Sequence, residues 1–259
     1  MISKMFRIAL TIVLASFALS SAAWAATCSN ASLSGTYGVL HGGTAVTGLP
    51  TRSMAWFMFD STRATFLSVT TASHDGVIAT ESIPGTYAVA SDCTGKGTWI
   101  SGTVKNNFSF VVTSTGFLLA TQFPGATQAG FGVKQGSPTC TNAGVKGSFG
   151  FEATGIFVAG APVTGPVAFV GELKLSVNTS GDGVISGEVA GSVDGTNFNF
   201  AEQPVTGSYT IDTDCRGRAT IKPDGLFELH FNLVVVDDGK QMLAVETDAD
   251  TVVSGAFQR

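Results

Sequence analysis

Apolar and polar residues alternate along most of the chain, and the clearest case is the segment 226–236, LFELHFNLVVV. The odd positions from Phe227 to Val235 are all apolar, whereas Glu228, His230 and Asn232 stand between them. Successive side chains of a strand point to opposite faces. The segment therefore predicts a strand with one buried face. The turn at 237–239, DDG, and the segment QMLAVE after it predict a hairpin.

Segments of this kind, separated by turn residues, predict about eight strands in each half and almost no helix after residue 25. In the first half we expect them near 35–40, 54–71, 77–82, 85–91, 97–103, 107–113, 117–122 and 127–133. In the second half we expect them near 147–153, 167–178, 184–193, 197–212, 217–222, 226–236, 241–247 and 251–257.

The two halves repeat each other. CSNASLSGTYG begins at Cys28 and CTNAGVKGSFG at Cys140, whereas GTYAVASDCTG begins at Gly85 and GSYTIDTDCRG at Gly207. A further match, SHDGVIA at 73–79 with SGDGVIS at 180–186, predicts that the first repeat lacks a stretch here and has short third and fourth strands. The duplication indicates two domains, 26–136 and 139–259, joined by a short linker.

Eight antiparallel strands without a helical layer must bury one face among themselves. A closed barrel removes the sheet edges, and a two-sheet sandwich is the alternative. We favour two tandem up-and-down barrels of about eight strands each. An outer-membrane barrel is disfavoured because the predicted strands are short and the Phe residues lie inside them rather than in two girdles.

These motifs resemble a group of exported bacterial proteins without assigned function. The resemblance rests on C-[ST]-N-A-x-x-x-G-[ST]-[YF]-G, on G-[ST]-Y-x-[VI]-x-x-D-C-x-G and on the closing VVVDDGKQMLAVETDADTVVSGAFQR. It covers both halves, is closer in the second, and implies barrels of the allene oxide cyclase or calycin type. Plant cyclases with such a barrel bind an oxidised fatty acid in the lumen. None of their functional residues match positions here, so cyclase activity is not carried over.

The first 25 residues are typical of a bacterial secretory signal. Lys4 and Arg7 precede an apolar run at 8–19, and the small residues at 20–25 predict cleavage after Ala25. The run is shorter than a membrane span, and Cys28 is a poor lipidation site. We therefore expect a secreted or periplasmic protein without a transmembrane span after cleavage.

The charge composition restricts the classes of partner that the protein is expected to bind. Charged residues make up 13% of the chain and the formal net charge is −5, which becomes two units more negative when Lys4 and Arg7 leave with the signal. No basic cluster is present, so we expect neither nucleic acid nor an anionic membrane as a partner.

Four cysteines in an exported chain predict two disulfides. The repeat selects Cys28–Cys93 and Cys140–Cys215, and an up-and-down order of strands places these cysteines at one end of each unit. Free thiols or a metal site are the alternative. The sequence has no C-x-x-C pair and only three histidines, so we expect no metal and no cofactor.

No catalytic motif stands out. We interpret His41, His74 and His230 as solvated or turn residues, since a triad or a three-histidine site would need both domains. The acidic pairs at 212/214, 237/238 and 248/250 are interpreted as turns, with a cation at 248/250 as the alternative. Asp92 and Asp214 are expected to accept hydrogen bonds from turn N–H groups.

Glutamates and tyrosines also occur within the predicted strands. We expect the strand glutamates to face solvent; one facing a lumen would have a raised pKa. They are Glu152, Glu172, Glu188 and Glu246. Tyr87 and Tyr209 are expected to pack at strand ends against the disulfides.

Trp56, Phe57 and Phe59 lie in the segment MAWFMF, which is apolar on both faces. This predicts that the outer face of the strand is covered, and we expect the three residues to contact the other barrel.

The sequence thus favours a non-enzymatic exported protein that binds a small apolar ligand in a lumen or in an inter-barrel groove. A lumen of eight strands can just hold one small molecule or be filled by side chains. The alternatives are a structural or surface-interaction module of the cell envelope and, less favoured, an isomerase or cyclase-like enzyme.

Overall fold

The computed structural model describes residues 27–45, 48–123, 126–137, 139–198, 203–225 and 227–259. The described residues form antiparallel strands and two short 3-10 segments, with no α-helix among them. The predicted signal at 1–25 lies outside this range. No helix in the described part of the chain is long and apolar enough to span a membrane.

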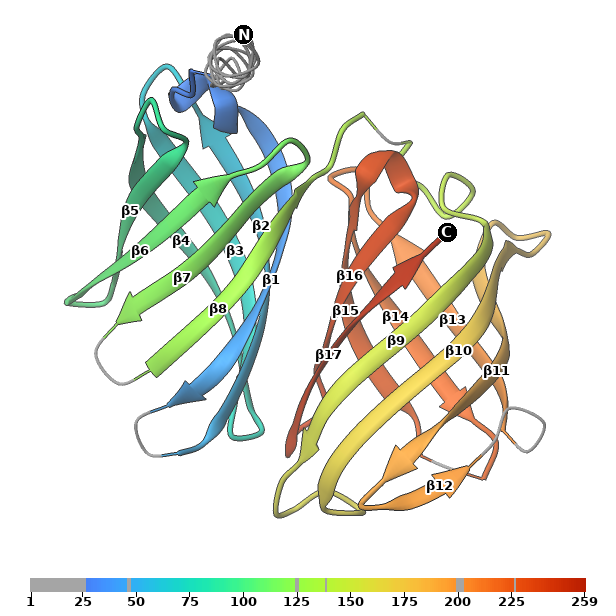
Figure 1. Cartoon of the computed structure of the whole chain (residues 1–259). Helices are drawn as coiled ribbons and strands as arrows, with labels where there is room; N and C mark the ends of the chain where they lie inside the picture. The colour runs from blue at the N-terminus through green and yellow to red at the C-terminus, as the bar shows by residue number, and fades with distance from the viewer. Residues whose placement is uncertain (1–26, 46–47, 124–125, 138, 199–202, 226) are drawn as a thin grey trace, which may run out of the picture.

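The first half is a closed barrel of eight strands, hereafter barrel 1 (Figure 1). Each strand pairs with its neighbours in the chain, and β8 returns to pair with β1. The strands are β1 (Gly35–Ala45), β2 (Pro50–Asp60), β3 (Thr65–His74), β4 (Val77–Val89), β5 (Thr94–Ser101), β6 (Val104–Val112), β7 (Gly116–Phe123) and β8 (Ala126–Lys134).

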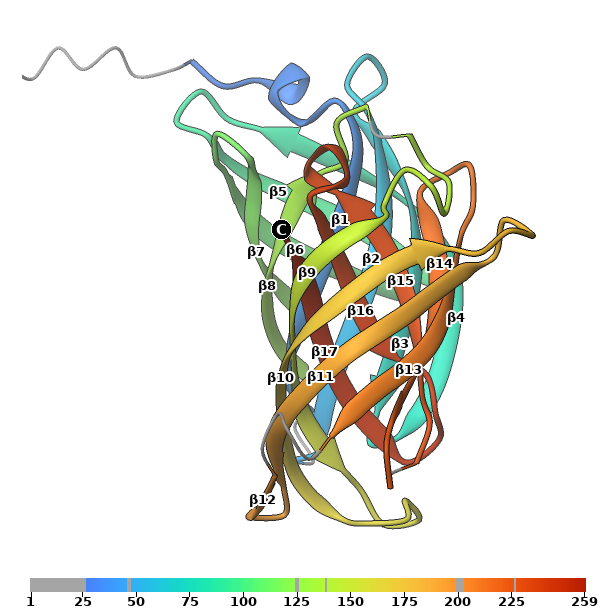
Figure 2. The same ribbon diagram turned by 90° about the vertical axis from the view of Figure 1, so that its right-hand side faces the viewer.

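The second half, barrel 2, closes in the same way through the pairing of β10 with β11 and of β9 with β17. Figure 2 shows its strands tilted around the barrel. They are β9 (Gly147–Phe157), β10 (Gly165–Val177), β11 (Gly183–Val193), β13 (Pro204–Ile211), β14 (Arg216–Pro223), β15 (Leu229–Val236), β16 (Gln241–Glu246) and β17 (Thr251–Gln258), with β12 (Thr196–Phe198) as a short extra strand beside β11. The prediction of two tandem eight-stranded barrels is confirmed.

Strand boundaries in the first half differ from the prediction. The expected strand 54–71 is two strands, β2 and β3, whereas the expected strands 77–82 and 85–91 are the single strand β4. The expected short third and fourth strands are therefore wrong, because β4 has 13 residues. SHDG joins the third strand of barrel 1 to the fourth, β3 to β4, whereas SGDG joins the second strand of barrel 2 to the third, β10 to β11. The two turns are therefore not equivalent, and their similar sequences indicated the wrong correspondence between strands.

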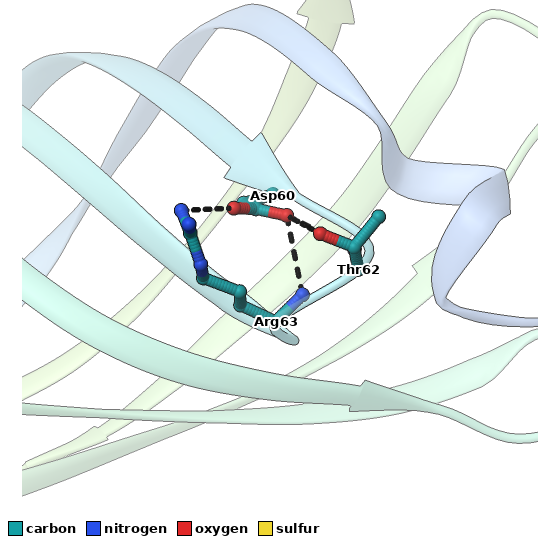
Figure 3. Close-up of polar contacts among 3 residues, drawn as sticks. All are labelled: Asp60, Thr62 and Arg63. Carbon is teal, nitrogen blue, oxygen red and sulfur yellow. Dashed lines mark hydrogen bonds and ion pairs between the residues drawn. The ribbon is translucent and has the colours of Figure 1, made fainter.

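The turn that divides β2 from β3 is built around Asp60 (Figure 3). Its Oδ1 accepts hydrogen bonds from the main-chain N–H groups of Thr62 and Arg63 and from the Thr62 hydroxyl. Its Oδ2 pairs with the Arg63 guanidinium at 3.1 Å. The Thr62 hydroxyl and then the Arg63 N–H lower the pKa of Asp60. An aspartate that binds its own following residues is a common turn former.

Both predicted disulfides are present, Cys28–Cys93 and Cys140–Cys215. Cys93 and Cys215 adopt left-handed backbone conformations with φ of 68° and 66°. The preceding aspartates accept hydrogen bonds from the N–H groups of Thr94 and Arg216, as the turn interpretation of Asp92 and Asp214 predicted. Each bridge ties the segment before a barrel to the loop after its fourth strand.

The two barrels pack side by side, with the outer faces of β1, β2 and β3 against those of β15, β16 and β17 (Figure 1). The contact is apolar and comprises Met54, Val234, Val236, Leu243, Val245 and Ala256, bordered by Leu40, Trp56, Phe131 and Val133. Gly38 lets β1 approach closely, because a Cβ at this position would overlap the side chains of Val234 and Val236.

Trp56 lies at this contact. Its indole N–H donates to Gln135 Oε1 at 3.2 Å, and the Arg216 guanidinium lies 5.5 Å from its ring centroid. The prediction that Phe57 and Phe59 also make the contact is wrong, because both side chains belong to the core of barrel 1. Neighbours on a strand point to opposite faces. One face of this segment therefore contributes to the contact with barrel 2, and the other contributes to the core of barrel 1.

Polar contacts join the barrels at both ends of this interface. At the linker, Gln135 Nε2 donates to the Val235 carbonyl at 3.1 Å. At the other end, the Asp250 N–H donates to the Gly76 carbonyl at 2.9 Å, and Asn232 Nδ2 donates to Thr71 Oγ1 at 3.0 Å. The hairpin between β3 and β4 is thereby held against barrel 2.

Candidate functional site

One end of barrel 1 is closed by the chain that precedes it. The 3-10 segment η1 (Asn30–Leu33) lies across this end, and Leu33 is fully buried. The Tyr87 hydroxyl donates to the carbonyls of Asn30 and Leu33 at 3.1 and 3.0 Å. Asn30 Oδ1 in turn accepts a hydrogen bond from the Val89 N–H at 2.8 Å. We call this arrangement of asparagine, tyrosine and strand N–H the clasp.

Below the clasp the interior is filled with aromatic rings. Neighbouring centroids lie 5.0–6.1 Å apart, and most pairs are edge-to-face or tilted. The rings come from Tyr37, Phe57, Phe59, Phe66, Tyr87, Phe108, Phe110 and Phe117, with Trp99 against Phe108. We call this cluster of rings the aromatic floor.

Inward-facing glycines make room for the rings. A Cβ at Gly97 would overlap the ring of Phe108, one at Gly95 the ring of Phe110, and one at Gly132 the ring of Phe117. The rings therefore lie across backbone that carries no side chain. Glycine in a strand often marks such a close approach.

On the side of the floor away from the clasp lies a cavity of about 260 Å³. Rings of the floor and small aliphatic groups form its inner end, and polar groups gather toward its mouth. Its lining comprises Val39, His41, Ser53, Phe57, Phe66, Ser68, Thr70, Ala72, His74, Ala79, Glu81, Ile83, Trp99, Asn106, Phe108, Phe117, Leu119, Thr121 and Gln128. His74, Ala79 and Glu81 line the cavity and are also exposed, so it reaches solvent at the end opposite the clasp.

His41 is the most strongly perturbed group of the cavity wall. Its Nδ1 lies 3.1 Å from Gln128 Oε1, and Gln128 Nε2 donates to Thr51 Oγ1 at 2.8 Å. Burial lowers the pKa of His41 to about 4, against the opposing effect of the Gln128 hydrogen bond. The imidazole is therefore neutral near pH 7. The interpretation of His41 as a solvated turn residue is wrong, since it lies within β1 and faces the lumen.

His74 stands at the mouth of the same cavity. Burial lowers its pKa, and the negative charge of Glu81 acts in the opposite direction. Neither Lys nor Arg belongs to the described residues that line the cavity, so the wall offers no fixed positive charge. That His41 and His74 share one lumen could not be predicted from the sequence, because the two residues lie on different strands whose relative register was not known.

The interior of barrel 2 is packed with large apolar side chains. Its core includes Phe149, Phe157, Phe231, Phe257 and Leu173, each less than 2% exposed. By the repeat offset of 112 positions, Val39 corresponds to Phe151 and His41 to Ala153. Both counterparts belong to the packed core. At these two positions barrel 2 therefore has a larger apolar side chain than barrel 1 and no histidine.

The prediction that Glu246 faces solvent is wrong. Its side chain is fully buried, and neither carboxyl oxygen has a hydrogen-bond partner among the described residues. Burial raises its pKa to about 9, assisted by the nearby Asp248 carboxylate. Leu243 and Val245 occupy the outer face, which barrel 1 covers, so Glu246 points inward. Glu152, Glu172 and Glu188 are exposed, as expected.

The remaining candidates lie in turns or on the surface. His230 is exposed and its Nδ1 lies 2.7 Å from Asp248 Oδ1. Asp237, Asp238 and Asp250 have positive φ, in agreement with their interpretation as turn residues. Among the residues that the structure describes, no cluster of three or more His, Cys, Asp or Glu side chains could hold a metal ion.

No family model matches the chain, and no curated protein matches it. Among solved structures, it is similar to a protein of unknown function of the DUF3598 family from Nostoc punctiforme PCC 73102, at 11% identity over 88% of this chain and 97% of that chain, with a TM-score of 0.25. It is also similar to kievitone hydratase from Nectria haematococca, at 5% identity over 87% and 89% of the two chains, with a TM-score of 0.32. At these TM-scores neither similarity carries an argument. The resemblance to allene oxide cyclase-type or calycin-type barrels stays a prediction.

Proposed function

We propose that this is an exported binding protein, in which barrel 1 takes up a small, largely apolar molecule and barrel 2 is a filled support. The observation that carries the proposal is the cavity of about 260 Å³ between the aromatic floor and the polar mouth. Ligand sites are typically concave, mostly apolar and furnished with a few placed polar groups. This lumen has all three properties.

The volume limits the size of the ligand. A cavity of ~150 Å³ lined by apolar groups takes up benzene, so by proportion this one suits a molecule of roughly ten carbon atoms. The mouth at His74, Ala79 and Glu81 gives a route of entry. The clasp and the floor close the opposite end, so the ligand enters and leaves by one route.

The polar wall supports binding rather than catalysis. His41 is hydrogen-bonded to the neutral amide of Gln128, which cannot stabilise an imidazolium as a carboxylate would. A histidine with a pKa of about 4 is a weak base at neutral pH. These groups suit the orientation of a bound molecule.

The direct test is titration of the protein with naphthalene, a ten-carbon apolar probe, by isothermal calorimetry. We expect saturable binding of one equivalent. Ala79→Trp places a large side chain at the mouth and should abolish this binding. Thr86→Trp is the control, because Thr86 is exposed on the outer face of the same strand, and it should bind like the wild type.

Native mass spectrometry of protein purified from its own host provides a second test. A small bound molecule that Ala79→Trp displaces would support the proposal. A bare protein mass, together with no uptake of naphthalene, would refute it.

A further inference from the structure

The polar groups of the cavity wall bear on which chemical class of ligand binds, whereas the apolar floor does not. His41 on β1 and Ser53 on β2 are directly opposite each other in the antiparallel register, and both line the cavity. Directly opposed residues on one face have Cβ atoms about 5 Å apart. The imidazole and the hydroxyl therefore stand side by side in the wall.

The hydrogen bond to Gln128 fixes which nitrogen of His41 carries the proton. Gln128 Nε2 donates to Thr51 Oγ1, so Oε1 is the atom that faces His41 and can only accept. Nδ1 of the neutral ring must then donate, which leaves Nε2 as an acceptor. Nε2 is at the edge of the ring away from Cβ and thus extends further into the lumen.

We infer that the cavity selects apolar molecules that carry a neutral hydroxyl group, and that His41 Nε2 accepts a hydrogen bond from this hydroxyl while Ser53 Oγ donates one to it. The inference rests on the proposed function and names the class of ligand. An alcohol both donates and accepts, and therefore satisfies both wall groups. An ether cannot donate to Nε2 and leaves it unpaired, which is costly in a desolvated site.

A carboxylate suits the wall poorly. It would place a negative charge beside neutral His41, with no Lys or Arg among the described lining residues and with Glu81 at the mouth. Burial of an unpaired charge is far more unfavourable than burial of a hydroxyl that has partners. The expected ligand is therefore not a fatty-acid anion.

The test compares octan-1-ol with its constitutional isomer dibutyl ether and with octanoate, by calorimetry at pH 7.5. We expect the alcohol to bind roughly tenfold more tightly than the ether, as one hydrogen bond to a buried group implies. Octanoate should bind at least ~100-fold more weakly than the alcohol. Equal affinity of alcohol and ether, or tighter binding of octanoate, would overturn the inference but leave the cavity a binding site.

Substitutions test whether the wall residues cause the preference for alcohol over ether. His41→Leu removes the acceptor at similar volume and should reduce the alcohol-to-ether ratio to about one, with ether affinity retained. His41→Gln keeps an acceptor and should retain part of the preference. Ser53→Ala removes a donor that serves the hydroxyl and the ether oxygen alike, so it should weaken the binding of both probes and leave their ratio unchanged. A ratio unchanged in His41→Leu would refute the role assigned to His41, and unchanged affinity of both probes in Ser53→Ala would refute the role assigned to Ser53. Failure of all three probes to bind the wild type would refute the proposed function itself.

Discussion

The Tyr209 hydroxyl donates a hydrogen bond of 2.8 Å to the main-chain oxygen of Asn142, and the side-chain oxygen of Asn142 accepts one of 2.8 Å from the Ile211 N–H. Barrel 1 has the same clasp between Tyr87, Asn30 and Val89. The asparagine of the repeated C-[ST]-N-A motif therefore has a structural role: with the adjacent disulfide it fixes the segment that closes each barrel.

Loss of the clasp should destabilise each barrel. Asn142→Ala leaves the Ile211 N–H without its partner, and we expect a loss of ~1–3 kcal/mol in the free energy of unfolding. Asn142→Asp keeps an oxygen acceptor and is the control, which should lose less. Urea unfolding monitored by circular dichroism gives the values. Equal stability of wild type and Asn142→Ala would show that the hydrogen bond contributes nothing.

A second prediction concerns the aromatic floor. Gly97→Ala forces a methyl group against the ring of Phe108 and should cost ~1–3 kcal/mol, the usual range for overpacking. Gly150→Ala is the control, because Gly150 is exposed in β9 and a Cβ there would meet only the Gln258 carbonyl at 3.7 Å. If both variants unfold at the same urea concentration, the floor is more adaptable than the close ring packing implies.

The fold could be predicted because its determinants are local or repeated. Alternating segments such as 226–236 marked the strands, and the duplicated cysteine motifs marked the barrels and their bridges. The errors arose where a local signal was ambiguous. Asp60-Ser-Thr at 60–62 is a turn signal inside an otherwise apolar stretch, and SHDG resembled SGDG although the two turns occupy different places in the barrels.

The cavity could not be predicted from either repeat alone. Whether a lumen is open depends on side chains from many strands, such as Val39 on β1 and Gln128 on β8, whose positions depend on register. A second ambiguity arose because the outer faces of some strands are covered by the other barrel. Leu243 and Val245 are apolar because barrel 1 covers them, so the alternation in β16 assigned Glu246 to the wrong face.

A third prediction concerns the contact between the barrels. Trp56→Ser removes a half-buried ring, its hydrogen bond to Gln135 and its contact with Arg216, with an expected loss of ~2 kcal/mol in interface stability. Trypsin should then cleave faster after Lys134, beside the linker, and small-angle scattering should show a larger radius of gyration. Met58→Ser, at an exposed outward position of the same strand, should change neither. Unchanged proteolysis and scattering in Trp56→Ser would contradict the role assigned to the indole.

The last prediction concerns pH. The pKa of Glu246 is about 9 in the folded protein against an ordinary value of 4.5, so the folded state retains a proton that the unfolded chain releases. The stability that this proton provides is complete below pH 4.5 and is lost as pH rises toward 9, by at most ~1.4 kcal/mol per pH unit. His41 has the opposite effect between pH 6.5 and about 4, because its folded pKa is lowered and the folded state resists protonation.

The contribution of Glu246 is therefore separable between pH 7 and 9, where His41 is neutral in both states. Over this range we expect the urea midpoint of the wild type to fall steadily with pH. Glu246→Gln keeps the shape of the side chain but cannot ionise, so its midpoint should stay flat and should exceed that of the wild type at pH 9. Glu188→Gln, at an exposed position of β11, is the control and should follow the wild type. A wild-type midpoint that is constant from pH 7 to 9 would mean that Glu246 is ionised in the folded protein, and that an unseen partner compensates its charge.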